Sequence, residues 1–172
     1  MTHAIRAAVE SASAYLTEHS DETAYTDSVA TAVLGDGLHV RVTGSAGELL
    51  ETDMPAAVGG SGTGASPGWF FRASLAACVA SLVGMRAAQL GIEGLSCEVE
   101  VDSASDDRGI LGIDQSVPAG PASIRIGLRL SANDAASGDL EALGRWSVEH
   151  CPVSEAAGRA VPVDVDVDIT TA

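Results

Sequence analysis

The sequence contains no lysine, and its nine basic residues are all arginine. Because the chain also has 24 acidic residues, its formal net charge is −15 over 172 residues. Such an acidic surface repels phosphate backbones and anionic lipid head groups, so we expect neither nucleic acid nor membrane as a partner. Aromatic residues make up only 3% of the chain. The core must therefore consist mostly of Val, Leu, Ile and Ala.

The N-terminus lacks the uninterrupted apolar segment of an export signal. In the most apolar stretch, residues 69–90, Arg72 and Arg86 leave too short an apolar run to span a bilayer. The three cysteines are an odd number in a chain without an export signal, which argues against a structural disulfide framework. We therefore expect a cytoplasmic protein with free thiols.

Several catalytic motifs are also absent from the sequence. No CxxC, HxxxH or HExxH spacing supports a metal site built from Cys78, Cys151, His150 and His39. The glycine-rich stretch 59–66 has no lysine for a phosphate-binding P-loop. We expect no metal and no other cofactor.

The first part of the chain changes from helical to strand periodicity. Apolar residues three or four positions apart predict a helix over 3–19. Alternation on either side of a Gly-Asp-Gly turn predicts a hairpin of strands 27–34 and 38–43. We therefore divide the chain into an N-terminal helical extension, residues 1–24, and one domain, residues 25–172.

The middle of the chain carries the strongest helix signals. Ser66 is a good N-cap, Pro67 fits the first helical position, and Gly91 fits the position after the last turn. These residues predict a helix over 67–90. Because the helix is apolar on nearly every side, we expect it to be central and covered all round.

Further strands and one helix follow the central helix. Period-two alternation predicts strands over 96–101 and 123–130 and a last strand over 161–169, and an apolar stripe predicts a helix over 139–150. The last strand has one face of aliphatic residues and one face of three aspartates, Asp164, Asp166 and Asp168. Because like charges on one strand face repel each other, we expect Arg125 and Arg129 as their cross-strand partners.

This order of elements indicates an α+β fold in which a mostly antiparallel curved sheet wraps around a buried central helix. A helix this apolar is hard to cover within a chain of 172 residues. An intertwined dimer would supply the missing cover.

The cysteines differ in their surroundings. Cys97 lies on the inward face of a predicted strand, where a free thiol behaves as a small buried hydrophobe. Cys78 lies in the middle of the central helix and, considered by itself, would also be a core residue. Cys151 precedes Pro152 at a predicted helix end, where free backbone N–H groups can lower the pKa of a thiol.

The sequence resembles the OsmC/Ohr family, the osmotically inducible and organic hydroperoxide resistance proteins, over about residues 26 to 170. The matching features are a glycine pair, a helix start, a cysteine-bearing helix, an acidic loop and a Cys-Pro-Val motif. They read Gly59-Gly60, Ser66-Pro67, FFRASLAACVASLVGMRAAQLGI, DDRGILGIDQSVPAG and HCPVSEA. A cysteine in a buried helix followed later by CPV is specific as a pair.

The resemblance implies an intertwined homodimer and a peroxidase that needs neither metal nor flavin. In such a peroxidase the first cysteine attacks an organic hydroperoxide and becomes a sulfenic acid, with which the second cysteine condenses to form a disulfide. An external dithiol then reduces that disulfide. Carried over by position, Cys78 is the peroxidatic thiol and Cys151 the resolving thiol.

Two positions depart from the family pattern. Gly68 stands where the peroxidases carry a glutamate, and the predicted first strand lacks the arginine that pairs with the reactive thiolate. Arg41, on the following strand, is the candidate substitute. The alternative function is therefore a non-peroxidase OsmC-like protein that binds a small apolar ligand or senses redox state at the dimer interface. A third alternative is a structural dimer with buried thiols.

Overall fold

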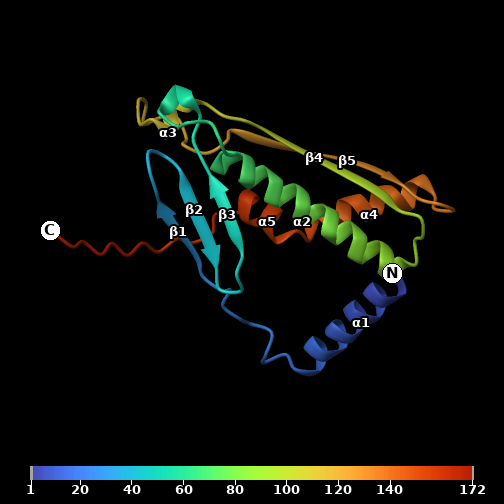
Figure 1. Ribbon diagram of the computed structural model, residues 1–172. Helices are drawn as coiled ribbons and strands as arrows, with labels where there is room; N and C mark the ends of the chain where they lie inside the picture. Colours follow the sequence, from blue (N-terminus) through green and yellow to red (C-terminus); the bar gives the residue numbers. More distant parts are fainter. Residues whose placement is uncertain (1, 172) are drawn as a thin grey trace.

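A computed structural model describes residues 2–171 and has the expected α+β class, with a long helix, α2, beside two antiparallel sheets (Figure 1). The elements are α1 (Thr2–Glu18), β1 (Ala30–Leu34), β2 (Val40–Gly44), β3 (Leu49–Thr52), the 3₁₀ turn η1 (Ala56–Val58), α2 (Pro67–Leu90), β4 (Ser96–Ala104), α3 (Asp107–Ile110), β5 (Ser123–Ser131), α4 (Ser137–Glu149) and α5 (Pro152–Gly158). The three-stranded sheet has the order β1-β2-β3, and the second sheet pairs β4 with β5.

Helix α2 begins and ends where its capping residues predict. The Ser66 side chain accepts a hydrogen bond from the Trp69 backbone N–H, and Gly91 ends the helix with φ 73°, a left-handed conformation that favours glycine. One face of α2 is buried along a stripe with a spacing of four: Leu75, Val79, Val83 and Ala87.

The expectation that α2 is covered all round is wrong for the single chain. Trp69 and Leu90 are each 50% exposed and Met85 is 40% exposed. Against the expectation that no segment could span a bilayer, α2 is long and apolar enough to cross a membrane by length and composition. We interpret it as the core helix of a soluble protein, because its buried stripe packs on β4 and α4.

The second sheet and α4 complete the core around α2. Cys97, Val99 and Val101 of β4 lie on the face turned to α2, opposite aliphatic residues of β5. Helix α4 adds Leu143, which is 1% exposed. A Cβ at Gly144 would come within 3.3 Å of the Leu130 side chain, so glycine allows α4 to lie this close to β5.

The expected partners of Arg125 and Arg129 are wrong. The register pairs Arg125 with Asp102 and Arg129 with Glu98, and both arginines form ion pairs on the outer face of this sheet. Arg129 also contacts Glu100, at 3.1 Å. The arginines therefore neutralise acidic residues of β4, the neighbour that the antiparallel register places opposite them.

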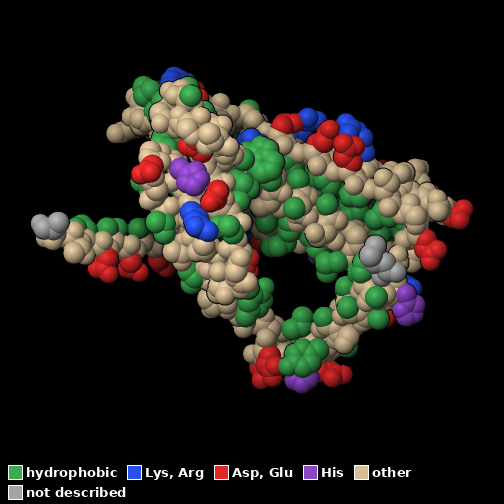
Figure 2. Space-filling model, viewed as in Figure 1, with side chains coloured by type: hydrophobic (Ala, Val, Ile, Leu, Met, Phe, Trp, Pro, Cys, Tyr) green, Lys and Arg blue, Asp and Glu red, His purple; other side chains and the backbone are tan. Residues whose placement is uncertain are grey.

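The last strand, expected over 161–169, does not form. This segment has no secondary structure, and Figure 1 shows it extending away from the rest of the chain. Its aliphatic residues, Val163, Val165, Val167 and Ile169, are 75–80% exposed. Figure 2 shows hydrophobic side chains along one side of the segment and acidic ones along the other. The alternation is therefore real, but no strand of the described chain lies beside it.

The N-terminal sheet is also thinly covered. The hairpin of β1 and β2 forms with Leu34 opposite Val40, close to the predicted bounds, whereas β3 was not expected. Every residue of β1 is exposed, including Val33 at 62% and Leu34 at 63%.

Helix α1 contacts the C-terminal part of α2. The Arg6 guanidinium donates a hydrogen bond to the carbonyl oxygen of Gln89 and lies beside Gly91. A cation at a helix C-terminus is favourable for the helix dipole. Arg6 supplies this cation to α2, which has no basic residue in its own last turn.

Candidate active site

The two expected site cysteines come from different elements. Cys78 lies in α2 and is partly buried, whereas Cys151 lies between α4 and α5 and is fully buried, at 0% exposed. Cys78 packs against the core cluster that contains Cys151, and the Cys151 thiol lies close enough to raise the pKa of Cys78. The fold therefore brings together two sulfur atoms that are far apart in the sequence.

The position of Cys151 follows from its neighbours. His150 ends α4, and Pro152 begins α5, so Cys151 is the extended N-cap residue between two helices, with φ −78° and ψ 115°. Its Sγ accepts a hydrogen bond from the Ser154 backbone N–H at 3.3 Å. Two helices thus fix the direction of this side chain.

The surroundings of Cys78 keep its thiol protonated. Burial raises the pKa of Cys78, and the neighbouring Cys151 thiol raises it further. A backbone hydrogen bond from Val153 lowers this pKa. No arginine among residues 2–171 contributes to the shift, so Arg41 does not fill the role of an activating cation within this chain.

The family's glutamate position is open in this chain. A Cβ at Gly68 would meet Arg72 Nη1 at 3.8 Å, so a side chain there would point toward Arg72. Arg72 instead reaches Ser103, with Nη1 at 3.5 Å from the hydroxyl.

The third cysteine lies apart from this pair. Cys97 is on β4 opposite Leu130, and burial raises its pKa. In the described part of the chain, no group of three or more His, Cys, Asp and Glu side chains is arranged to hold a metal ion. Cys97 therefore serves as a core residue beside Val99.

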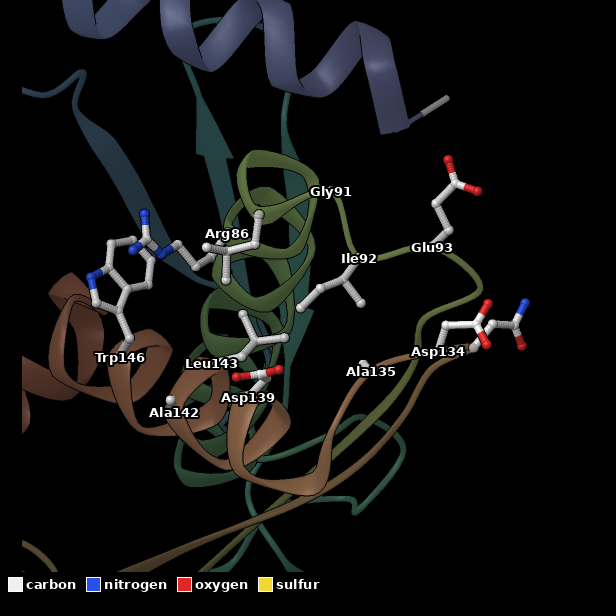
Figure 3. Close-up of a pocket in the computed structure, with 12 residues that line it drawn as sticks. Arg86, Gly91, Ile92, Glu93, Asp134, Ala135, Asp139, Ala142, Leu143 and Trp146 are labelled. Atoms are coloured by element: carbon white, nitrogen blue, oxygen red, sulfur yellow. The ribbon is translucent and has the colours of Figure 1, made fainter.

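A cavity of about 770 Å³ lies at the C-terminal end of α2, and neither Cys78 nor Cys151 lines it. Figure 3 shows Arg86 and Trp146 on one side and Asp134 and Glu93 on the other. The guanidinium carbon of Arg86 lies 4.7 Å from the centroid of the Trp146 ring. This contact could not be predicted from the sequence, because a cation–π pair between two helices produces no periodic pattern.

A profile of the OsmC-like protein family matches residues 60–166. The chain belongs to this family. The matched region includes α2, the second sheet and both cysteines of the candidate site. No curated protein shows detectable sequence similarity to the chain.

Solved structures support the same OsmC-like fold. An organic hydroperoxide resistance protein OsmC from Legionella pneumophila is 25% identical, with a TM-score of 0.53 and coverage of 78% of this chain and 90% of that chain. An OsmC-like protein from Mycoplasma pneumoniae is 14% identical, with a TM-score of 0.66 and coverage of 78% and 89%. An organic hydroperoxide resistance protein from Elizabethkingia anophelis is 21% identical, with a TM-score of 0.56 and coverage of 79% and 90%.

Proposed function

We propose that this protein is a thiol-dependent peroxidase that reduces organic hydroperoxides through Cys78 and Cys151. The observation that carries the proposal is the close packing of these two thiols in one core cluster. Membership of the OsmC-like family, and similarity to structures named organic hydroperoxide resistance proteins, support it. The aliphatic neighbours of Cys78 suit a hydroperoxide with an apolar body.

The proposed cycle has three balanced steps. The Cys78 thiolate attacks the terminal hydroxyl oxygen of the hydroperoxide and becomes a sulfenic acid as the O–O bond breaks. The alkoxide that leaves takes a proton from solvent and becomes an alcohol. The Cys151 sulfur then attacks the Cys78 sulfur, and the sulfenic oxygen leaves as water when the disulfide forms. An external dithiol reduces the disulfide by thiol–disulfide exchange and is itself oxidised.

The raised pKa of Cys78 makes the first step dependent on pH. Because the thiolate is the nucleophile, the rate of oxidation should rise with pH up to a pKa above the ordinary thiol value of about 8.5.

A second chain could lower this pKa by supplying a cation. We propose an intertwined homodimer in the cytoplasm, and the uncovered α2, β1 and 161–169 faces support such a partner.

The test is stopped-flow mixing of the reduced protein with cumene hydroperoxide. We expect the loss of two thiols per chain, abolished by Cys78→Ser. Cys151→Ser should stop the reaction at the Cys78 sulfenic acid, detected by dimedone labelling and mass spectrometry. Cys97→Ser is the matched control and should react as the native chain does. If Cys78 stays reduced in excess peroxide, the chain is not a peroxidase.

A second candidate function follows from the raised pKa of Cys78, which favours a slow or unreactive thiol. The protein would then be a non-peroxidase member that binds a small apolar ligand or senses redox state. The apolar part of the cavity, formed by Leu90, Ile92 and Leu143, is one place for such a ligand. Thermal stabilisation by a fatty-acid-like molecule without thiol loss would favour this function over peroxide reduction.

A further inference from the structure

Two contacts between helix α2 and the α4–α5 segment lie far apart along α2. One is the contact between Cys78 and Cys151. The other is the Arg86 guanidinium over the Trp146 ring, 4.7 Å from its centroid (Figure 3). Arg86 is eight positions after Cys78, about 12 Å along the helix. The cycle proposed above uses the first contact and assigns no role to the second.

The Arg86–Trp146 contact holds the last turns of α4. The Trp146 ring is also stacked on His150, with ring centroids 4.1 Å apart and an interplanar angle of 17°. The His150 ring nitrogen Nδ1 lies 2.8 Å from the Trp146 carbonyl oxygen. His150 directly precedes Cys151, the N-cap residue of α5. A shift of Trp146 would therefore also move Cys151.

Neighbouring residues hold Arg86 on α2 and the part of α4 that carries Trp146. Arg86 Nη1 donates to Gln89 Oε1 at 3.3 Å, which orients the guanidinium plane on α2. On α4, Leu143 and Ser147 are buried, and the Ser147 hydroxyl donates to the Leu143 carbonyl oxygen at 2.8 Å. A pair anchored in this way can set the register of α4 against α2.

We propose that Arg86 and Trp146 are positioning residues for the resolving step, in which Cys151 attacks the oxidised Cys78. Neither side chain touches the reacting sulfur atoms. Their role is to keep the α4–α5 junction against α2, so that the Cys151 sulfur stays in line with the Cys78 sulfur. This inference rests on the proposed peroxidase cycle, but the geometry on which it depends can be measured without peroxide.

The chemistry makes this step sensitive to small displacements. Disulfide formation brings the two sulfur atoms to about 2.05 Å with a defined torsion angle. A misplacement of about 1 Å in an intramolecular reaction can cost roughly 10²-fold in rate. The first oxidation depends only on Cys78 and the peroxide, so loss of the Arg86–Trp146 contact should not slow it.

The experiment compares four full-length chains, each reduced and mixed with cumene hydroperoxide in a quenched-flow apparatus. They are the native chain, Arg86→Met, Arg86→Lys and the control Arg145→Met. Arg145 lies next to Trp146 on α4 but is exposed and paired with Glu141, so its loss leaves the contact intact. Dimedone labelling reports the sulfenic acid, and mass spectrometry of alkylated peptides reports the disulfide.

We expect Arg86→Met to slow disulfide formation by at least about tenfold while the rate of sulfenic acid formation changes less than about twofold. Arg86→Lys keeps a cation over the ring and should recover most of the rate. Arg145→Met should behave as the native chain does. Equal rates of disulfide formation in the native chain and Arg86→Met would overturn the inference.

A second measurement keeps the inference testable if the native chain does not react with peroxide, which would reject only the proposed function. In glutathione redox buffers, the equilibrium between the Cys78–Cys151 disulfide and the dithiol gives the effective concentration of the two thiols. We expect Arg86→Met to lower this effective concentration by about tenfold and Arg86→Lys to restore it. An unchanged value would overturn the inference.

Discussion

The two halves of the molecule have equally regular sequence patterns and very different burial. Around α2, β4, β5 and α4, apolar positions turn toward one core, and Leu75, Val79 and Val83 are at most 1% exposed. In β1 and in the segment 161–169, aliphatic side chains alternate or cluster in the same way and remain exposed. A sequence pattern thus shows which residues can be buried. The residues that pack on them and exclude water have to come from another part of the fold or from another chain.

The largest expected effect is on the free energy of unfolding, when a buried leucine and an exposed leucine are each replaced by alanine. Leu75→Ala should lower the free energy of unfolding by about 2–5 kcal/mol, because it leaves a cavity in the core. Leu34→Ala on β1 should cost less than about 0.5 kcal/mol, because this side chain is 63% exposed. Urea denaturation at one fixed protein concentration measures both.

A large loss of stability for Leu34→Ala would show that the exposed half is covered in solution. The same measurement at several protein concentrations then identifies the cover, because only association with a second copy makes the loss depend on concentration.

The second prediction concerns the segment 161–169. If its aliphatic face pairs with a second copy, the double variant Val165→Asp, Val167→Asp should raise the dimer dissociation constant at least tenfold. The reason is that each lost valine removes about 1.5 kcal/mol or more of burial free energy from the interface. The matched control is Asp166→Ser, on the acidic side. Sedimentation equilibrium gives the constants, and equal values for the native chain and the double variant would mean that this face is not part of a dimer.

The sequence predicted the elements whose signals are local. The ends of α2 follow from Ser66, Pro67 and Gly91, because each acts within one helical turn. The inward faces of β4 and β5 follow from alternation. The strand over 161–169 and the ion pairs of Arg125 and Arg129 were wrong, because a ladder partner depends on how distant segments meet.

The candidate site could be predicted only in part. The pairing of Cys78 with Cys151 came from resemblance to a family, since no spacing rule relates two cysteines so distant in the sequence. Their contact, the missing cation and the Arg86–Trp146 pair needed the packing of α2 against the α4–α5 segment. Composition and periodicity contain no information on that packing angle.

The third prediction uses Asp53, which anchors the loop between the thinly covered sheet and α2. Its carboxylate is 2% exposed and accepts hydrogen bonds from Ser61, Thr63 and the Met54 backbone N–H. The Ser61 hydroxyl contributes most to lowering the pKa of Asp53 to about 2. Asp53→Asn should lower the melting temperature at pH 7 by several degrees, because the charged acceptor of this network is lost.

The pH dependence gives the sign of this effect. The folded pKa is about 2 and the unfolded value about 3.9, so the stability contributed by the carboxylate is present above pH 4 and is lost as pH falls toward 2. The difference in melting temperature between the native chain and Asp53→Asn should therefore shrink over this range. The control is Asp36→Asn, in the exposed turn before β2, and a constant difference from pH 7 to pH 2 would contradict the assignment.

The smallest expected effect is on the outer face of the well-covered half. Arg129 is 66% exposed and forms ion pairs with Glu98 and Glu100 across the β4–β5 ladder. Because solvent and salt screen exposed pairs, Arg129→Gln should lower the melting temperature by no more than about 3 °C, and the loss should disappear in about 1 M salt. Arg145→Gln, which breaks a single exposed pair with Glu141, should cost still less. A loss for Arg129→Gln that persists in high salt would mean that its guanidinium is shielded from water by something other than this chain.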